Sequence, residues 1–150
     1  MLDSTNIYYI AGQSNYIQNI KKYDITNGVV TSLFSLVDAT KLAVDASNIY
    51  TKTTSGTGSI YLSDKNTENL TPDLIDVYTT KEIYSDGTYV YWIDGPGTIS
   101  RVDIATGTAR TIATGLCNVQ AIAIDHSDIF FTVSSSCGYV VGGSVNKLSL

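Results

Sequence analysis

The sequence predicts an all-β fold made of β-propeller blades, and three observations lead to this prediction. An aspartate followed by an aliphatic–aromatic pair recurs in steps of 42, 41 and 39 residues, at Asp3, Asp45, Asp86 and Asp125. A second aspartate series keeps the same period with steps of 40 and 39, at Asp24, Asp64 and Asp103. Each period holds short β-branched and aromatic runs between turn residues, without helical periodicity. Four antiparallel strands in about 40 residues are typical of a propeller blade, whereas the coils of a β-solenoid, the alternative, are usually shorter.

The third repeat is the most regular. Tyr89–Ile93 is β-branched and aromatic throughout, the residues Asp94 to Gly97 turn the chain, and Thr98–Ile104 alternates its side chains. With Lys81–Ser85 before this hairpin and Ala109–Thr114 after it, the repeat predicts a complete four-stranded blade.

The remaining repeats are less regular but follow the same order. The first is expected to form three strands, Ile7–Ala11, Tyr16–Ile25 and Val29–Leu36, and its Asn27-Gly28 pair is a strong hairpin signal. The second is expected to form four strands, Lys41–Val44, Ile49–Lys52, Ser59–Ser63 and Leu70–Ile75. The last is expected to form three strands, Gln120–Ile124, Ile129–Val133 and Ser144–Leu150.

The chain is therefore predicted to be one partial propeller domain, residues 1–150, an incomplete ring of roughly three and a half to four blades. The expected blades are approximately residues 2–38, 39–79, 80–119 and 120–150. Such an arc would leave apolar faces bare at both ends. We expect it to close either with the rest of a longer chain or with copies of itself, a homo-oligomer in which the dimer is favoured.

The composition of the chain limits the kinds of partner that we expect it to bind. The net charge is −5 without a cluster of lysines or arginines, so no nucleic-acid partner is expected. No apolar run approaches the ~20 residues of a membrane helix, and the start of the chain lacks the pattern of a signal peptide. The few lysines and the many Tyr, Ser and Thr residues favour an exported bacterial protein, extracellular or periplasmic.

The two cysteines are expected to form a disulfide. Pairing Asp125 with Ile129 across the last hairpin gives a register whose residue numbers sum to 254, and Cys117 and Cys137 share that sum. Two unpaired thiols in a cytosolic protein are the alternative.

The recurring aspartates are interpreted as turn residues that accept backbone N–H groups, with calcium binding as the alternative. His126 is the only histidine and falls in a predicted turn, so no metal centre built from several histidines is possible within one chain. We expect no metal and no cofactor.

The entries of the predicted inner strands mark the default ligand position. Thr40, Lys81 and Gln120 lie at equal offsets before three of the repeated aspartates, and Tyr78 and Asn118 fall in the adjoining loops. In a propeller these positions surround one mouth of the central channel. A small molecule, a glycan or a protein would be the ligand class.

The segment Tyr89 to Gly107, with Val90-Tyr91-Trp92-Ile93-Asp94 followed by Ile99-Ser100-Arg101-Val102-Asp103, resembles the repeats of YWTD-type and NHL-type propellers. It is also similar to bacterial gluconolactonase-like and streptogramin-lyase-like propellers. The resemblance implies the propeller fold but lies on scaffold positions, and propellers serve unrelated functions. A non-catalytic binding or scaffold module is the favoured hypothesis. A lactonase- or lyase-like enzyme with its active site at the channel mouth is the alternative.

Overall fold

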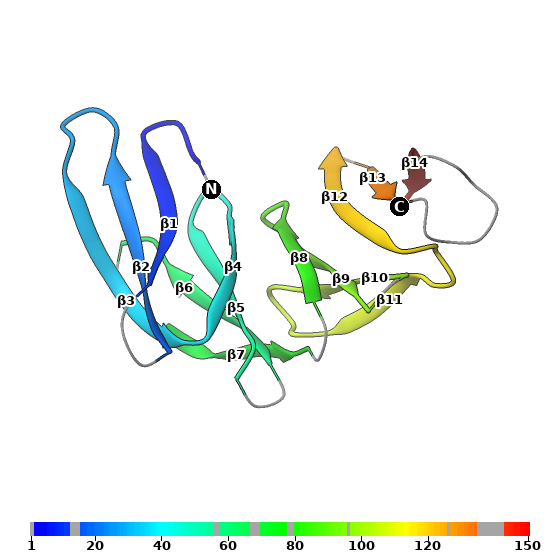
Figure 1. Cartoon of the computed structure of the whole chain (residues 1–150), viewed down its shortest axis with the longest axis horizontal. Coiled ribbons are helices and arrows are strands. Elements are labelled where there is room, and N and C mark those ends of the chain that lie inside the picture. The colour runs from blue at the N-terminus through cyan, green and yellow to red at the C-terminus, as the bar shows by residue number, and fades with distance from the viewer. Residues whose placement is uncertain are drawn as a thin grey trace. The chain divides into compact units, whose positions relative to one another are not determined.

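The computed structural model describes residues 2–12, 16–55, 58–66, 70–77, 80–95, 97–125, 127–134 and 143–150, with the backbone alone for 71–73. The chain divides into two compact units, Met1–Tyr78 and Thr79–Leu150. Figure 1 shows the strands of both units in chain order. Tyr78, His126 and Cys137, which the sequence singled out, lie outside the described residues.

Each unit contains two antiparallel sheets whose strands follow one another in chain order. In the first unit, sheet 1 contains β1 (Asn6–Gly12), β2 (Ile17–Asp24) and β3 (Val30–Val37), and sheet 2 contains β4 (Ala39–Val44), β5 (Asn48–Thr53), β6 (Ser59–Asp64) and β7 (Leu70–Asp76). In the second unit, sheet 3 contains β8 (Thr80–Ser85), β9 (Tyr89–Asp94), β10 (Thr98–Asp103) and β11 (Ala109–Ala113), and sheet 4 contains β12 (Val119–Asp125), β13 (Asp128–Val133) and β14 (Ser144–Ser149).

The predicted fold class is confirmed. The described residues form fourteen strands in sheets of three, four, four and three, all antiparallel, and they differ from the predicted strands only at their ends. None of the described residues forms a helix that is long and apolar enough to span a membrane. The hairpin that opened the sequence argument is β9 and β10, in which Trp92 pairs with Ser100 and Tyr91 with Arg101.

Every sheet has two distinguishable faces, because successive side chains of a strand point to opposite sides. One face, here called the tyrosine face, carries the aromatic residue of the repeated pair, namely Tyr8, Tyr50, Tyr91 and, in sheet 4, Phe130. The opposite face, here called the aliphatic face, carries the residue before it, namely Ile7, Ile49, Val90 and Ile129.

The core of each unit forms where a tyrosine face meets an aliphatic face. In the first unit, Tyr8 and Ile20 of sheet 1 pack with Ile49 of sheet 2. In the second unit, Tyr91 of sheet 3 packs with Ile129 of sheet 4. All of these side chains are at most 2% exposed. Sheets of one unit therefore stack in the same sense, the tyrosine face of the earlier sheet against the aliphatic face of the later one.

In sheets 1, 2 and 3 an aspartate stabilises the turn that precedes the strand carrying the repeated tyrosine. The carboxylate accepts backbone N–H groups of the turn and the tyrosine hydroxyl, and we call this arrangement an aspartate clasp. In sheet 3, Oδ1 of Asp86 accepts the N–H groups of Thr88 and Tyr89 at 2.8 and 2.7 Å, and Oδ2 accepts the hydroxyl of Tyr91 at 2.9 Å. The same arrangement occurs at Asp45 with Tyr50 and at Asp3 with Tyr8. These carboxylates thus have the turn role that the sequence predicts, and each ties its turn to the tyrosine face.

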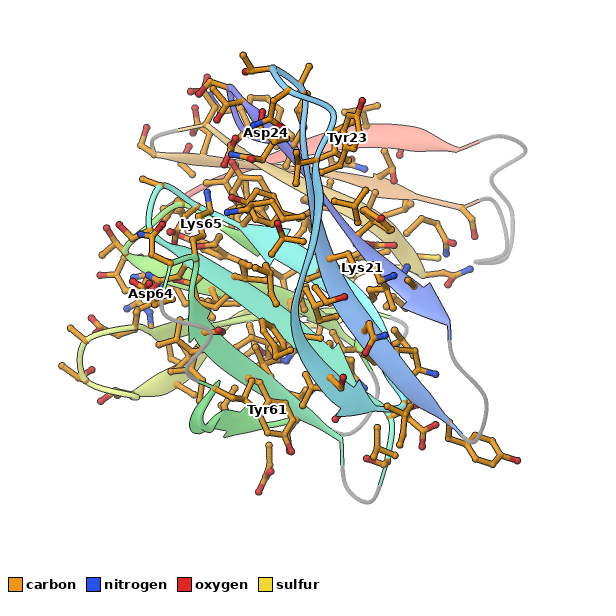
Figure 2. The ribbon with its side chains drawn as sticks, turned by 90° about the vertical axis from the view of Figure 1, so that its left-hand side faces the viewer. Lys21, Tyr23, Asp24, Tyr61, Asp64 and Lys65 are labelled. Carbon is orange, nitrogen blue, oxygen red and sulfur yellow. The ribbon has the colours of Figure 1, made fainter. Side chains whose placement is uncertain are left out.

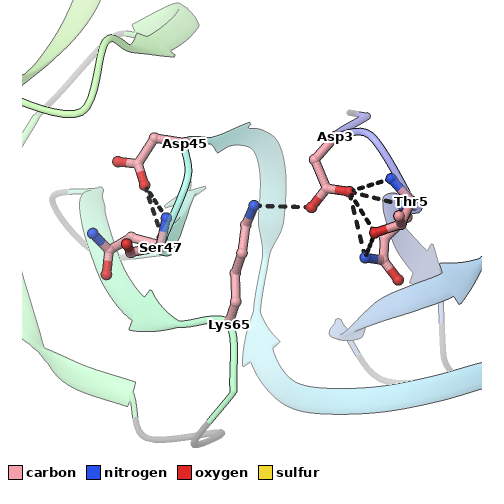
Figure 3. A network of polar contacts seen from close by, with 7 residues as sticks. Asp3, Thr5, Asp45, Ser47 and Lys65 are labelled. Atoms are coloured by element: carbon pink, nitrogen blue, oxygen red, sulfur yellow. Dashed lines mark hydrogen bonds and ion pairs between the residues drawn. The ribbon is translucent and has the colours of Figure 1, made fainter.

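The clasp of sheet 1 also receives a cation from sheet 2. Lys65 follows β6, and its Nζ lies 3.0 Å from Oδ2 of Asp3 (Figure 3). The same atom lies 5.0 Å from the centre of the Tyr8 ring. The Lys65 side chain is only 8% exposed. Figure 2 shows Lys65 beside the Asp64 turn in the first unit. Burial opposes ionisation of Asp3, but hydrogen bonds from Thr5, Lys65 and Asn6 outweigh it and hold the pKa of Asp3 well below its usual value.

The register predicted for the last hairpin is wrong by one residue. Asp125 pairs with Asp128, and Ile124, not Asp125, pairs with Ile129. A bulge between Val119 and Ala121 then shifts the pairing by one more residue. The register on which the cysteine pairing was based therefore does not hold in β12 and β13, because residue spacing alone does not reveal a bulge.

Replacing Tyr91 with Phe tests the clasp. The variant loses the hydroxyl that Asp86 accepts within a residue only 1% exposed. We expect the free energy of unfolding to fall by about 1 kcal/mol, measured by urea denaturation with the fluorescence of Trp92, the only tryptophan and 4% exposed. Tyr9→Phe, on the aliphatic face, is the control and should change stability by less than about 0.5 kcal/mol.

The same variant should change the dependence of stability on alkaline pH. Burial and the bond to Asp86 raise the pKa of Tyr91 to about 12, against roughly 10 in the unfolded chain. The contribution of the neutral phenol is therefore complete below pH ~10 and is lost as the pH rises through about 12. Tyr91→Phe should lose less stability over this interval than the native chain. An equal loss in both would contradict the clasp.

Candidate functional site

The three strand-entry residues that the sequence singled out all lie at β-bulges. Thr40 is the extra residue between Ala39 and Lys41, Gln120 occupies the same place in β12, and Lys81 lies in the register shift of β8. A bulge turns its extra side chain away from the regular alternation, and bulges are common beside functional sites. The equal offsets in the sequence therefore correspond to an equivalent irregularity in three sheets.

A residue with positive φ precedes two of these bulges. Asp38 has a φ of 54° and Asn118 a φ of 38°. Their carbonyls accept the N–H groups of Thr54 and Ser134 at 3.0 and 3.2 Å, which closes the first strand pair of each sheet. Non-glycine residues rarely adopt this conformation, and Asn and Asp tolerate it best. The residue types at 38 and 118 thus suit the start of the inner strand.

Three of the five predicted ligand residues form one hydrogen-bond network in the second unit. Nζ of Lys81 donates to Oδ1 of Asn118 at 2.7 Å and to the carbonyl of Val119 at 3.2 Å. Nε2 of Gln120 donates to Oδ1 and to the carbonyl of Asn118 at 2.9 and 3.0 Å. Nδ2 of Asn118 donates to Oγ of Ser134 at 2.5 Å. Asn118 is the centre of this group, which we call the inner-strand cluster.

The other two predicted residues are not part of this network as described. Thr40 belongs to the first unit, where its hydroxyl donates to the carbonyl of Lys52 at 3.3 Å. Tyr78 lies outside the described residues. Ser134 was missed by the sequence argument, although the hairpin that contains Asn118 would have indicated it once the bulge at Gln120 was known.

The inner-strand cluster offers an ammonium, two amides and a hydroxyl. Such groups can hydrogen-bond a polar ligand, and Gln120 is exposed to receive one. None of the four described residues of the cluster, Lys81, Asn118, Gln120 and Ser134, is a carboxylate. Over the part of the chain that the structure describes, no three His, Cys, Asp or Glu side chains gather to hold a metal ion.

The cysteine prediction remains a prediction. Cys117 is half-buried in the link between β11 and β12, and no described residue is a free cysteine. Cys137 lies outside the described residues.

A pair of arginines was also missed by the sequence argument. Arg101 on β10 pairs across the strands with Arg110 on β11. Together with Tyr89 they line a hollow of about 310 Å³ on the tyrosine face of sheet 3. The guanidinium of Arg101 lies 3.9 Å from the centre of the Tyr89 ring. Hairpin pairing of β10 with β11 could have brought the two residues together from sequence alone.

The architecture defines a class of protein. Antiparallel sheets of three or four strands that recur about every 40 residues and pack face against face are β-propeller blades. The chain is thus a partial β-propeller.

Comparison with solved structures agrees with this class. TolB from Acinetobacter baumannii matches with a TM-score of 0.78 and 16% identity over 98% of this chain and 39% of its own. The computationally designed Ika4 protein matches with a TM-score of 0.64 and 18% identity over 99% of this chain and 94% of its own. A chain of the nidogen/laminin complex matches with a TM-score of 0.69 and 16% identity over 94% of this chain and 58% of its own.

These identities show the fold alone. The chain spans 39% of the TolB chain and 58% of the nidogen/laminin chain, in each case less than two thirds. No protein-family model and no curated protein matches the sequence.

Replacing Asn118 with Ala tests the inner-strand cluster. The change removes the amide shared by Lys81, Gln120 and Ser134 and keeps a side chain at a φ of 38°. We expect a loss of about 1–3 kcal/mol in the free energy of unfolding. Gln120→Ala is the control, because it removes only an exposed partner, and it should cost less than about 0.5 kcal/mol. Equal stability of Asn118→Ala and the native chain would show that the cluster does not order the strand entry.

The disulfide is tested by peptide mapping without reduction. Protein prepared under oxidising conditions should yield one linked peptide that contains Cys117 and Cys137. A bridge closing about 20 residues would stabilise the fold by roughly 3 kcal/mol. Recovery of both residues as unmodified thiols would contradict the prediction.

Proposed function

We propose that this chain is a non-catalytic binding and scaffold module that completes a β-propeller with further blades. One observation carries the proposal, which is the unequal exposure of equivalent core positions. Ile7 on the aliphatic face of sheet 1 is 40% exposed, whereas its equivalents Ile49 and Ile129, each covered by the other sheet of its own unit, are 0% exposed. A position that is fully buried in two repeats and open in a third indicates that a neighbour is missing there.

Other apolar residues on the aliphatic face of sheet 1 share this exposure. Ile17, Val30 and Val37 lie on the same face and are 39%, 51% and 49% exposed. Polar groups interrupt the apolar ones, since Lys21 and Tyr23 also point to this side, as their alternation with Ile17 along β2 requires. Figure 2 shows Lys21 and Tyr23 along the β2 ribbon.

The second uncovered face belongs to sheet 4. On its tyrosine face, Phe130 pairs with Ala123, and Val145 pairs with Thr132. Val145 is 73% exposed, and a shallow apolar hollow of about 190 Å³ runs across β12, β13 and β14. The two open faces are therefore of opposite kinds, one aliphatic face and one tyrosine face.

Opposite kinds are what the packing rule of both units requires. A tyrosine face of one chain and the aliphatic face of another would continue the stacking seen inside each unit. Such a contact is heterologous and can close into a ring. A second copy supplies both faces, so we favour a dimer, and the rest of a longer chain would supply equivalent blades. We propose in addition that the protein is exported and that Cys117 and Cys137 form a disulfide. Disulfides persist in the oxidising environment outside the cytoplasm, where the bridge would stabilise the module.

Binding is the proposed activity of the assembled module, and the inner-strand cluster is the proposed contact for a polar ligand. Its amides and ammonium suit a glycan, a small molecule or a protein loop. The described residues supply no observation that favours the lactonase- or lyase-like alternative.

Light scattering on dilute, soluble protein tests the assembly. We expect a mass that is a multiple of the 16.1 kDa monomer, with two chains favoured. Val145→Lys should reduce the mass to that of the monomer, because a buried ammonium on an apolar face is costly. The control Val29→Lys changes a residue that is 53% exposed in a hairpin turn and should leave the mass unchanged. A folded native chain at 16.1 kDa would contradict closure by copies of this chain.

A further inference from the structure

The chain contains only two arginines, and they face each other across one strand pair. Arg101 on β10 and Arg110 on β11 are direct cross-strand partners, although the net charge of the chain is −5. Like charges in directly opposite positions destabilise a sheet. An anion placed between two guanidinium groups removes this repulsion. The arginine pair therefore favours the binding of an anion.

The guanidinium of Arg101 is held in a fixed orientation. It stacks on Tyr89 at 3.9 Å and lies 6.0 Å from the centre of the Tyr91 ring. Stacking fixes the plane of the fork and reduces the entropy that is lost when an oxyanion binds. Its Nε atom is buried and has no hydrogen-bond partner among the described residues. A buried N–H donor without an acceptor is unfavourable and is satisfied by a bound acceptor.

The residues that line the hollow carry more positive than negative charge. The hollow of about 310 Å³ is lined by Tyr89, Arg101, Asp103, Thr106, Thr108 and Arg110. Its one carboxylate, Asp103, is used by the β10–β11 turn, where Oδ1 accepts the N–H groups of Ala105 and Thr106 at 3.0 and 2.8 Å. Those hydrogen bonds, with the charge of Arg101, lower the pKa of Asp103. Two cations and one anion leave a net charge of +1 in the hollow.

The hollow also offers a hydroxyl donor. The side chain of Thr106 accepts the N–H of Thr108 at 3.3 Å and also hydrogen-bonds Asp103, whereas the hydroxyl of Thr108, which lines the hollow, can donate to a ligand. The volume of the hollow suits a small ligand or the charged end of a larger one.

We propose that this hollow binds an oxyanion, a carboxylate or phosphate group, between Arg101 and Arg110. The stacked guanidinium of Arg101 and the guanidinium of Arg110 provide the donors, and the threonine side chains bound the site. A free phosphate and the carboxylate of an acidic sugar or peptide share this chemistry. The site lies on a single sheet and does not depend on the assembly proposed above.

Arginine side-chain NMR tests the proposal directly. Because the chain has two arginines, a ¹⁵N-labelled sample gives two Nε–Hε signals, assigned from the single variants. Sodium phosphate and sodium galacturonate are titrated separately, each against sodium chloride at matched ionic strength. We expect the Arg101 signal to shift saturably with at least one probe, and which probe acts identifies phosphate or carboxylate as the ligand group. Equal shifts with chloride, or no saturable shift with either probe, would overturn the proposal.

Variants separate binding from folding. Arg110→Gln changes an exposed residue, so the fold should be kept while the affinity for the active probe falls roughly tenfold. Arg101→Lys keeps the charge but loses the fork, and the affinity should fall by a similar factor. Lys147→Gln on sheet 4 removes an equal charge outside the hollow and should leave the affinity unchanged. An Arg110→Gln protein that binds as well as the native chain, or a Lys147→Gln protein that is equally weakened, would show that the pair is not the site.

Discussion

The need to cover both faces of every sheet governs this structure. A sheet that is apolar on one side only can lie against water on the other, but these sheets carry Tyr50 or Tyr91 on one face and Ile49 or Val90 on the opposite face. In sheets 2 and 3 all four of these residues are at most 1% exposed. Within each unit the repeat stacks the tyrosine face of the earlier sheet against the aliphatic face of the later one. The assembly proposed above would extend the same pattern of packing.

The aspartate clasp gives a physical reason for the aspartate and the tyrosine to recur together in repeats that otherwise differ in sequence. One carboxylate fixes the turn through two backbone N–H groups and fixes the tyrosine through its hydroxyl, so Asp86 and Tyr91 constrain each other across five residues. A buried phenol needs such a partner. Lys65 adds a contact between sheets by approaching both Asp3 and Tyr8. The clasp thus links local turn geometry to the packing of neighbouring sheets.

The sequence was sufficient for the strands and the period because both depend on local chemistry, such as the Asn27-Gly28 turn and the β-branched run around Val90. It was not sufficient for the register of the last hairpin, because the bulge at Gln120 changes the pairing without changing the composition. The inner-strand cluster shows the same division. Equal spacing located Lys81 and Gln120, but the central role of Asn118 depends on a positive φ that spacing does not reveal. Arg101 entered the sequence argument only as part of a scaffold motif, because the pairing of its strand with the strand of Arg110 was not worked out.

Sheet 4 departs from the repeat in a way that suits an interface. Position 130 is Phe, so the hydroxyl that completes a clasp is absent there, and the centre of this face is apolar. At the edge, Nζ of Lys147 lies 2.7 Å from Oδ2 of Asp128, and that lysine lowers the pKa of Asp128. An apolar centre with charged groups at its rim is the usual anatomy of a protein–protein contact. A tyrosine at position 130 could be held by a hydrogen bond from its hydroxyl within its own sheet. Phe130 lacks this bond and is stabilised by burial against a neighbouring sheet instead. The residue that departs from the repeat is therefore well suited to contact another copy.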